Sequence, residues 1–191
     1  MRPVRPEDKE RLQEGLKHLS SESRYLRFMG GKKRLSQEEL RRFTELDWSR
    51  HQASIAVDSS QNGEPALGVA RCVRLEDEPK VAEVAVAVVD SVHGKGLGTL
   101  PLSIVVESAV DAGIRTFRAC ALGNNVPMLE IFHQLGAHAS RGEADTVVLD
   151  LPLPQDAESV PDSPARRVLK SVAQELLPEL LHPLHRRNSD T

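Results

Sequence analysis

The sequence passes from an apolar strand into a helix through VVDSVHGKGLGT, residues 88–99. Glycine occupies alternate positions of this turn, at residues 94, 96 and 98. Glycines let a backbone approach a ligand closely, and the free N–H groups at a helix start point outward at the positive end of the helix dipole. Such a turn suits a pyrophosphate, although a tight turn that requires positive φ angles would use the same glycines. We therefore interpret the loop as a candidate phosphate-binding turn.

Two common phosphate-binding motifs do not fit this loop. A Walker loop requires Gly-x-x-x-x-Gly-Lys followed by Ser or Thr, and the sequence contains no such string. A dinucleotide-binding turn requires Gly-x-Gly-x-x-Gly and an acidic residue about twenty positions later, at the end of the next strand. The next predicted strand, residues 116–122, has no acidic residue. The loop therefore predicts neither a Walker-type nor a dinucleotide-binding site.

The pattern around the loop predicts an α/β protein with a mixed sheet, of the α+β type. A capping box at residues 36–39 begins a helix, and the turn at residues 60–63 joins two antiparallel strands. The run of alanine and β-branched residues at 81–89 predicts a buried strand, and a crossover helix joins it to the next one. The predicted helices cover residues 6–19, 22–29, 36–46, 97–112 and 127–135, and the strands cover residues 52–58, 66–75, 81–89, 116–122 and 146–151.

The composition changes after Leu151, which divides the chain into three predicted parts. Residues 1–151 form the folded domain, residues 152–164 form a proline-rich linker, and residues 165–191 form an amphipathic helical tail. The tail presents an apolar stripe that we expect to pack on the parent domain or on a second copy of the chain, as a homodimer. The stripe consists of Val168, Leu169, Val172, Leu176 and Leu177.

The composition of the chain limits the classes of partner and the cellular location that we expect. The hydrophobic share of 39% and the net charge of −3 fit a globular protein and give no support to a nucleic-acid partner. Basic residues crowd between residues 24 and 42, where they indicate either a solvated face or an anionic partner. Two cysteines predict no metal site. The absence of a signal peptide and of a membrane span predicts a cytoplasmic protein with no membrane partner.

Several blocks together resemble the GNAT superfamily of N-acetyltransferases. His93–Gly98 is similar to its pyrophosphate loop, Arg/Gln-x-x-Gly-x-Gly/Ala, with histidine in the first position. A second block, Asn124–Leu129, closes with Leu135-Gly136-Ala137. Ser20–Phe28 and the strand AEVAV at residues 82–86 look more narrowly like the catalytic domain of bacterial protein-lysine acetyltransferases. The resemblance runs over about residues 2–151.

The resemblance implies a central sheet flanked by helices and splayed between the strands at 81–89 and 116–122, where acetyl-CoA enters. It implies that the pantetheine pairs with backbone near Val86 and Val88, and that Asn125 faces the pantetheine or the thioester. As an alternative or additional role, Asn125 caps the following helix. The residues implied in pyrophosphate binding are His93, Gly94, Lys95, Gly96, Leu97, Gly98 and Thr99.

Glu83 is the one charged residue of an otherwise apolar strand. Strand alternation places it on the face of Ala85 and Ala87, and burial there would raise its pKa, which suits a group that takes a proton from an ammonium. The family resemblance implies the same role, a catalytic base. The alternative is a structural ion pair with an arginine of a neighbouring strand, namely Arg71, Arg74 or Arg118.

No general acid is evident from the sequence. Many family members use a tyrosine after the last helix, whereas the only tyrosine here is Tyr25. His133 is a weaker candidate, and solvent is an adequate proton source for a thiolate leaving group. The leading hypothesis is acetyl transfer from acetyl-CoA to a primary amine, with a protein lysine or a small-molecule amine as acceptor. The alternatives are a non-catalytic acyl-CoA sensor and an interaction module centred on the 165–181 helix.

Overall fold

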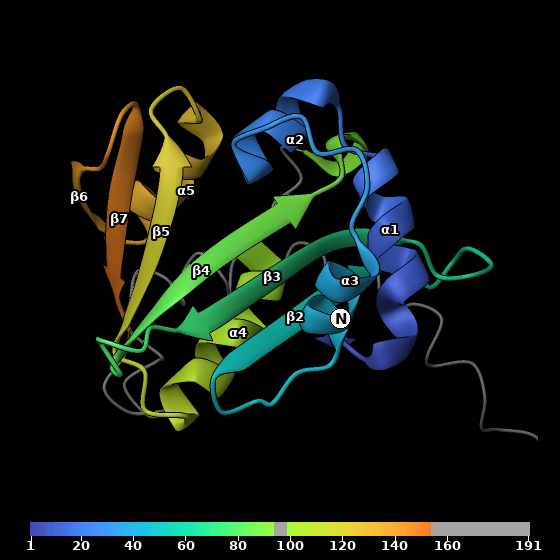
Figure 1. Cartoon of the computed structure of the whole chain (residues 1–191), viewed down its shortest axis with the longest axis horizontal. Helices are drawn as coiled ribbons and strands as arrows, with labels where there is room; N and C mark the ends of the chain where they lie inside the picture. The colour runs from blue at the N-terminus through green and yellow to red at the C-terminus, as the bar shows by residue number, and fades with distance from the viewer. Residues whose placement is uncertain (94–98, 154–191) are drawn as a thin grey trace, which may run out of the picture.

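The computed structural model describes residues 1–93 and 99–153, which form one sheet with helices on both faces (Figure 1). The strands of the described part follow the order β1-β2-β3-β4-β5-β7-β6. All neighbouring pairs are antiparallel except β4 and β5, which are parallel. The strands are β1 (Arg2–Pro3), β2 (His51–Val57), β3 (Ala66–Arg74), β4 (Val81–Val88), β5 (Thr116–Leu122), β6 (His138–Arg141) and β7 (Thr146–Pro152).

The helices divide between the two faces of the sheet. Helices α1 to α3 lie on the face that is nearer the viewer in Figure 1, and α4 and α5 lie behind the sheet. The helical elements are η1 (Pro6–Asp8), α1 (Lys9–Lys17), α2 (Ser21–Phe28), α3 (Gln37–Thr44), η2 (Asp90–Val92), α4 (Thr99–Asp111) and α5 (Val126–Gln134). The predicted crossover is confirmed, because α4 joins β4 to the parallel strand β5.

Alternating side chains of β4 separate two faces with different surroundings. Ala82, Val84 and Val86 are buried in a core that includes Leu102 and Val105 of α4. A second core on the opposite face of the sheet joins α1 and α3 to β2 and β3. The residues between them on β4, Glu83 among them, face the side of α1 to α3 because side chains alternate along a strand.

The splay of the sheet is visible in the register of β4 and β5. The two strands pair only from Val81 to Glu83 on β4, opposite Thr116 to Arg118 on β5. Both strands then continue apart, β4 to Val88 and β5 to Leu122, and leave the opening seen in Figure 1. The expected splayed sheet is therefore confirmed.

The sequence missed some short elements and placed some ends differently. Strands β1 and β6 were not predicted, because two to four residues carry too little periodicity to identify a strand. The first helix begins as the 3₁₀ turn η1 before α1. The last strand extends to Pro152, and Leu153 is buried beside it. The predicted tail lies outside the described residues, and no helix within them has the length and apolarity that a membrane span requires.

Candidate active site

The open edge of β4 carries backbone groups that β5 does not pair. The Lys80 carbonyl accepts hydrogen bonds from Arg115 and Thr116 at the start of β5, whereas the Val89 N–H donates to the Leu67 carbonyl in β3. Backbone groups alternate in direction along a strand, so even-numbered residues of β4 point toward β5 and odd-numbered residues toward β3. Beyond the paired segment, the C=O group of Val84 and the N–H and C=O groups of Val86 and Val88 therefore face the opening. This arrangement can pair with an extended amide-bearing ligand.

His93 lies at the end of this edge. Its Nε2 is 3.0 Å from the Val88 carbonyl oxygen, and its Nδ1 is 3.8 Å from Asp90. A ligand that pairs with the Val88 carbonyl from the opening would therefore have to displace the imidazole. The predicted pyrophosphate loop continues through Gly94, Lys95, Gly96, Leu97 and Gly98, which lie outside the described residues; Thr99 begins α4.

Asp90 ties the end of β4 to the start of α2. Its carboxylate accepts hydrogen bonds from the Ser20 N–H (2.5 Å), the Ser20 hydroxyl (3.1 Å) and the Ser23 hydroxyl (2.5 Å). Burial alone would raise the pKa of Asp90, but the hydrogen bonds from Ser23 and Ser20 hold it below its ordinary value. This cluster was not predictable from the sequence, because the serines are about seventy residues from Asp90 along the chain.

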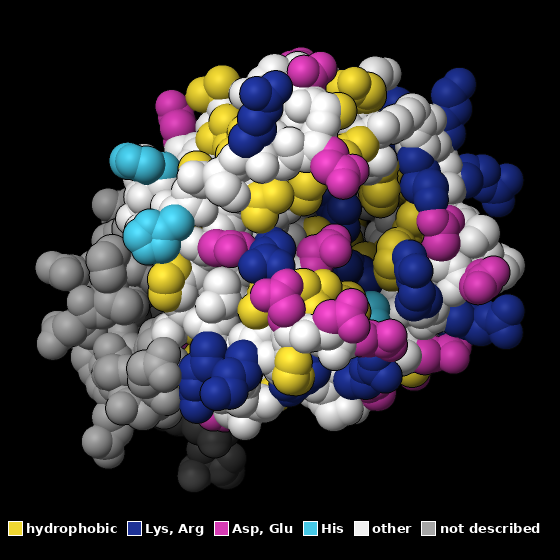
Figure 2. Space-filling model, turned by 60° about the vertical axis from the view of Figure 1, so that its left-hand side comes forward, with side chains coloured by type: hydrophobic (Ala, Val, Ile, Leu, Met, Phe, Trp, Pro, Cys, Tyr) yellow, Lys and Arg dark blue, Asp and Glu magenta, His cyan; other side chains and the backbone are white. Residues whose placement is uncertain are grey.

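Glu83 occupies the point where β4 and β5 separate, since it is the last residue of β4 that pairs with β5. The expected burial is wrong, because its side chain is exposed. Glu83 has a paired strand on each side, but its register partner Val73 is also exposed, so this end of the β3–β4 face is not covered. Figure 2 shows that the molecule is hollowed on this side and that acidic and basic side chains gather around the hollow.

The three arginines considered as partners for Glu83 have other contacts within the described residues. Arg118 forms ion pairs with Asp150 (2.8 Å) and Glu78. Arg74 donates to backbone carbonyls, and Arg71 lies over the ring of Phe43. The structural ion pair with these arginines is therefore not found there, and the Glu83 carboxylate remains accessible from the hollow.

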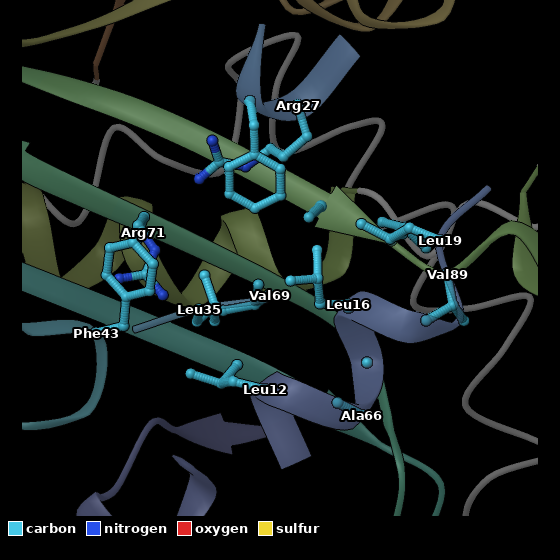
Figure 3. A pocket seen from close by; sticks show the side chains of 15 residues that line it. Leu12, Leu16, Leu19, Arg27, Leu35, Phe43, Ala66, Val69, Arg71 and Val89 are labelled. Carbon is cyan, nitrogen blue, oxygen red and sulfur yellow. The ribbon is translucent and has the colours of Figure 1, made fainter. Parts of the chain in front are cut away.

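A cavity lies between α1, α2, α3 and the strands β3 and β4 (Figure 3). Its lining is mostly apolar, with two cationic exceptions, Arg27 of α2 and Arg71 of β3. Burial lowers the pKa of Arg27. The negative charge of Glu83 acts in the opposite direction and raises that pKa by a smaller amount. Burial, together with the charges of Arg27 and Arg42, lowers the pKa of Arg71 to about 9. The sequence showed a crowd of basic residues here but not which of them turns inward.

Asn125 is buried at the start of α5. Its side-chain oxygen accepts the Met128 N–H at 3.4 Å, so the predicted helix cap is confirmed. The candidate acid His133 and the only tyrosine of the sequence, Tyr25, differ in position. His133 is exposed on α5. Tyr25 belongs to α2, which contacts both β4 and β5, so its distance along the chain from the site is not a distance in space.

Comparisons with known proteins agree with this geometry. Acetyltransferase Pat of Mycolicibacterium smegmatis is 30% identical over 183 residues, which cover 91% of this chain and 54% of that protein. The GNAT domain of S. lividans PAT has a TM-score of 0.72 at 29% identity, over 80% of this chain and 89% of that one. A cAMP-binding acyltransferase from Mycobacterium smegmatis has a TM-score of 0.56 at 26% identity, over 91% of this chain and 50% of that one. The chain thus spans about half the length of the curated relative Pat.

A family model described as an acetyltransferase (GNAT) domain matches residues 1–138. The match covers most of the chain and includes β4, the glycine loop, α4, β5 and α5. It agrees with the splayed strands and with the solved structures that share this fold. The chain therefore belongs to the GNAT acetyltransferase family.

Proposed function

We propose that this chain is an N-acetyltransferase that moves an acetyl group from acetyl-CoA to a primary amine, a protein lysine being the first candidate acceptor. The observation that carries the proposal is the open edge of β4, with Glu83 at its apex. The similarity to Pat, which is named an acetyltransferase, supports it over most of this chain.

The residues of the opening fit the shape of acetyl-CoA. The backbone groups of Val86 and Val88 would pair with the amides of the pantetheine, as an added strand would. The loop from His93 to Thr99 would hold the pyrophosphate through its N–H groups, and Asn125 would lie toward the thioester end while it caps α5. Bound in this way, acetyl-CoA supplies an activated acetyl thioester.

Glu83 would act as the general base. An alkylammonium must lose a proton before its nitrogen attacks, and an exposed carboxylate accepts that proton directly or through one water molecule. The C–N bond forms as the C–S bond breaks, and the departing thiolate takes its proton from solvent. The low basicity of a thiolate explains why no dedicated acid is required.

A cytoplasmic location belongs to the same proposal. Cys72 and Cys120 are free, and Cys120 is exposed, which suits a reducing compartment. We also propose that the tail, residues 165–191, pairs two copies of the chain through its apolar stripe.

Binding and turnover test the proposal separately. Acetyl-CoA at a hundred times its Kd should stabilise the fold by about 2.7 kcal/mol and raise the Tm accordingly. Gly96→Glu should abolish this shift, because the glutamate adds bulk to the predicted pyrophosphate loop and its negative charge repels the pyrophosphate. Labelled acetyl-CoA should then transfer its acetyl group to members of a panel of amines and cell proteins. Binding with no transfer to any acceptor would favour the acyl-CoA sensor instead, and no binding would refute both.

A further inference from the structure

Two arginines turn their guanidinium groups into the same cavity. Figure 3 shows Arg27 reaching in from α2 and Arg71 rising from β3 beside Phe43. The side chains around them are aliphatic, including Leu12, Leu16 and Leu35. A cluster of two like charges in an apolar cavity is unusual, because the buried Arg71 and the half-buried Arg27 lose hydration and repel one another.

The described residues supply little compensation for these charges: Glu83 acts electrostatically on Arg27 without forming an ion pair with it, and no carboxylate acts in this way on Arg71. Arg71 is 7% exposed; its neighbours are the Phe43 ring, with the centroid 4.0 Å from Cζ, and His51, whose Nε2 is 3.3 Å from Nη1. Burial and the charge of Arg71 lower the pKa of His51 to about 4, so the histidine is neutral near pH 7. Arg27 lies over the Phe28 ring at 5.0 Å. Within residues 1–93 and 99–153, no carboxylate forms an ion pair with either arginine at 4.0 Å or less.

The same domain pairs another buried charge fully. Asp8 is fully buried, and its carboxylate forms ion pairs with Arg2 at 2.6 Å and with Arg11 at 3.2 Å. Its remaining capacity is used by the Arg5 backbone N–H at 2.8 Å. Asp8 thus has two arginine partners, whereas Arg27 and Arg71 form no ion pair with a carboxylate of the described residues.

The cavity has room for a small anionic group. The cavity volume is about 60 Å³, which exceeds the roughly 10–15 Å³ that one water molecule occupies. A carboxylate fits such a volume, and a guanidinium presents parallel N–H donors that match its two oxygens. The aliphatic walls strengthen such a pair, because they exclude water from it.

The cavity also lies on the acceptor side of the proposed active site. Arg71 is the register partner of Ala85, and Val73 is the partner of Glu83, so Arg71 and Glu83 are diagonal neighbours on one face of the β3–β4 pair. Diagonal positions on such a pair are roughly 7–8 Å apart at Cα. Ala87 and Val88, further along β4, line the cavity itself. One molecule can therefore place an amine near Glu83 and a carboxylate near the arginines.

We propose that Arg27 and Arg71 form a carboxylate-binding subsite that selects amine acceptors carrying a carboxylate a short distance from the nitrogen. The inference rests on the proposed acetyl transfer and names the class of acceptor. The carboxylate is either that of a free amino acid-like amine or that of an acidic residue next to a lysine. Among the crowded basic residues between residues 24 and 42, Arg27 lines the cavity and serves the anion together with Arg71 of β3, whereas Arg41 and Arg42 are exposed on α3 and form a solvated face.

The test compares acceptors that differ only in charge. One pair is ε-aminocaproate and its amide; the other is a lysine peptide with aspartate before the lysine and the same peptide with asparagine. For at least one pair, kcat/KM of the full chain should favour the carboxylate by about tenfold or more, as a charge-assisted hydrogen bond allows. Arg27→Gln should bring this ratio close to one and change turnover of the neutral acceptor only a few-fold.

A matched control comes from the next helix. Arg41→Gln removes the same charge from an exposed residue of α3 that does not line the cavity, and it should leave the ratio unchanged. Arg71→Lys should keep most of the stability of the fold while it reduces the preference, because an ammonium lacks the planar fork. Melting temperatures of all variants identify any that are merely unfolded.

The two acceptor pairs distinguish the sources of the carboxylate. A preference in the small-molecule pair assigns the carboxylate to a free acceptor, and a preference in the peptide pair assigns it to a protein acceptor. Equal turnover of charged and neutral acceptors by the wild type, or an unchanged ratio in folded Arg27→Gln, overturns the subsite while acetyl transfer stands. If no amine is acetylated, calorimetry with ε-aminocaproate and its amide tests the subsite alone: a preference lost in Arg27→Gln supports the subsite without the enzyme, and no preference refutes it.

Discussion

At the scale of single residues, Glu83 shows how an accurate position can accompany an incorrect environment. Alternation along β4 correctly placed it on the face of Ala85 and Ala87. The burial that was expected depended on cover over this face of the sheet, and the exposed register partner Val73 shows that this end of it has none. A sequence pattern contains the alternation but not which part of a sheet face is covered, so the exposure was not predictable.

The proposed role of Glu83 leads to a direct test. Glu83→Gln should leave the Kd for acetyl-CoA within about twofold and reduce kcat by about 10²–10⁴-fold, the usual contribution of a general base. Glu107→Gln on α4, where the glutamate is exposed, removes the same charge from the opposite side of the sheet and should leave kcat unchanged. Steady-state kinetics and calorimetry measure both effects. Turnover of Glu83→Gln within a few-fold of the wild type would reduce Glu83 to a bystander.

Asp8 provides a residue-scale prediction about pH. Its burial favours the neutral acid, but the hydrogen bonds from Arg2 and the Arg5 backbone outweigh it and lower the pKa below 3.8. A lowered folded pKa means that this stabilisation is complete above the unfolded pKa and disappears as the pH falls through the folded one. Asp8→Ala should lower the free energy of unfolding by about 3 kcal/mol at pH 7, because it leaves two arginines without their partner. Urea unfolding at pH 7 and at pH 3 should show the difference from wild type shrinking in acid; a constant difference would contradict the ion-pair explanation.

At the scale of elements, long periodic segments were predictable and their mutual placement was not. The helix around α4 and the strands β3, β4 and β5 follow from apolar patterns and turn residues. The cap of α3, with reciprocal hydrogen bonds between Ser36 and Glu39, also follows from local spacing. By contrast, the contact of α2 with the end of β4 joins segments about seventy residues apart through Asp90. No local signal marks such a partner, because the carboxylate and the serines have equally ordinary roles in turns.

This connection predicts a specific effect on α2. Asp90→Asn should cost about 1 kcal/mol, less than a fully buried charged hydrogen bond because Asp90 is partly exposed. The amides of α2 should exchange with solvent faster, since the helix loses its anchor to β4. Asp58→Asn is the control, because Asp58 accepts hydrogen bonds from Ser60 and Gln61 within one loop and joins no distant elements. If the amides of α2 exchange with solvent at equal rates in the two variants, then packing, and not Asp90, holds the helix.

At the scale of the whole molecule, the fold class followed from the order of elements, whereas the acceptor side depended on which side chains turn inward. A single crossover between antiparallel segments leads to a mixed sheet with helices on both faces. The crowd of basic residues in the sequence includes both exposed side chains and the cavity-lining Arg27. The packing of α1, α2 and α3 over β3 separates them, and that packing is a property of the assembled domain.

The tail provides the last prediction, and the structure defines where to cut the chain. Leu153 is buried and its N–H donates to the Arg115 carbonyl at 2.8 Å, so a truncation must follow residue 153. Removing residues 154–191 should leave acetyl-CoA binding and the Tm shift intact, because the opening between β4 and β5 belongs to the described domain.

The predicted apolar stripe, about 1.5–3 kcal/mol for each buried leucine, is sufficient to hold two copies together. After truncation, light scattering should therefore show a smaller particle, or a solubility assay should show a change. A variant of the full chain with Leu169 and Leu176 changed to glutamate should behave like the truncated chain; if both keep the wild-type size and solubility, the stripe has no packing partner and the proposed dimer is wrong.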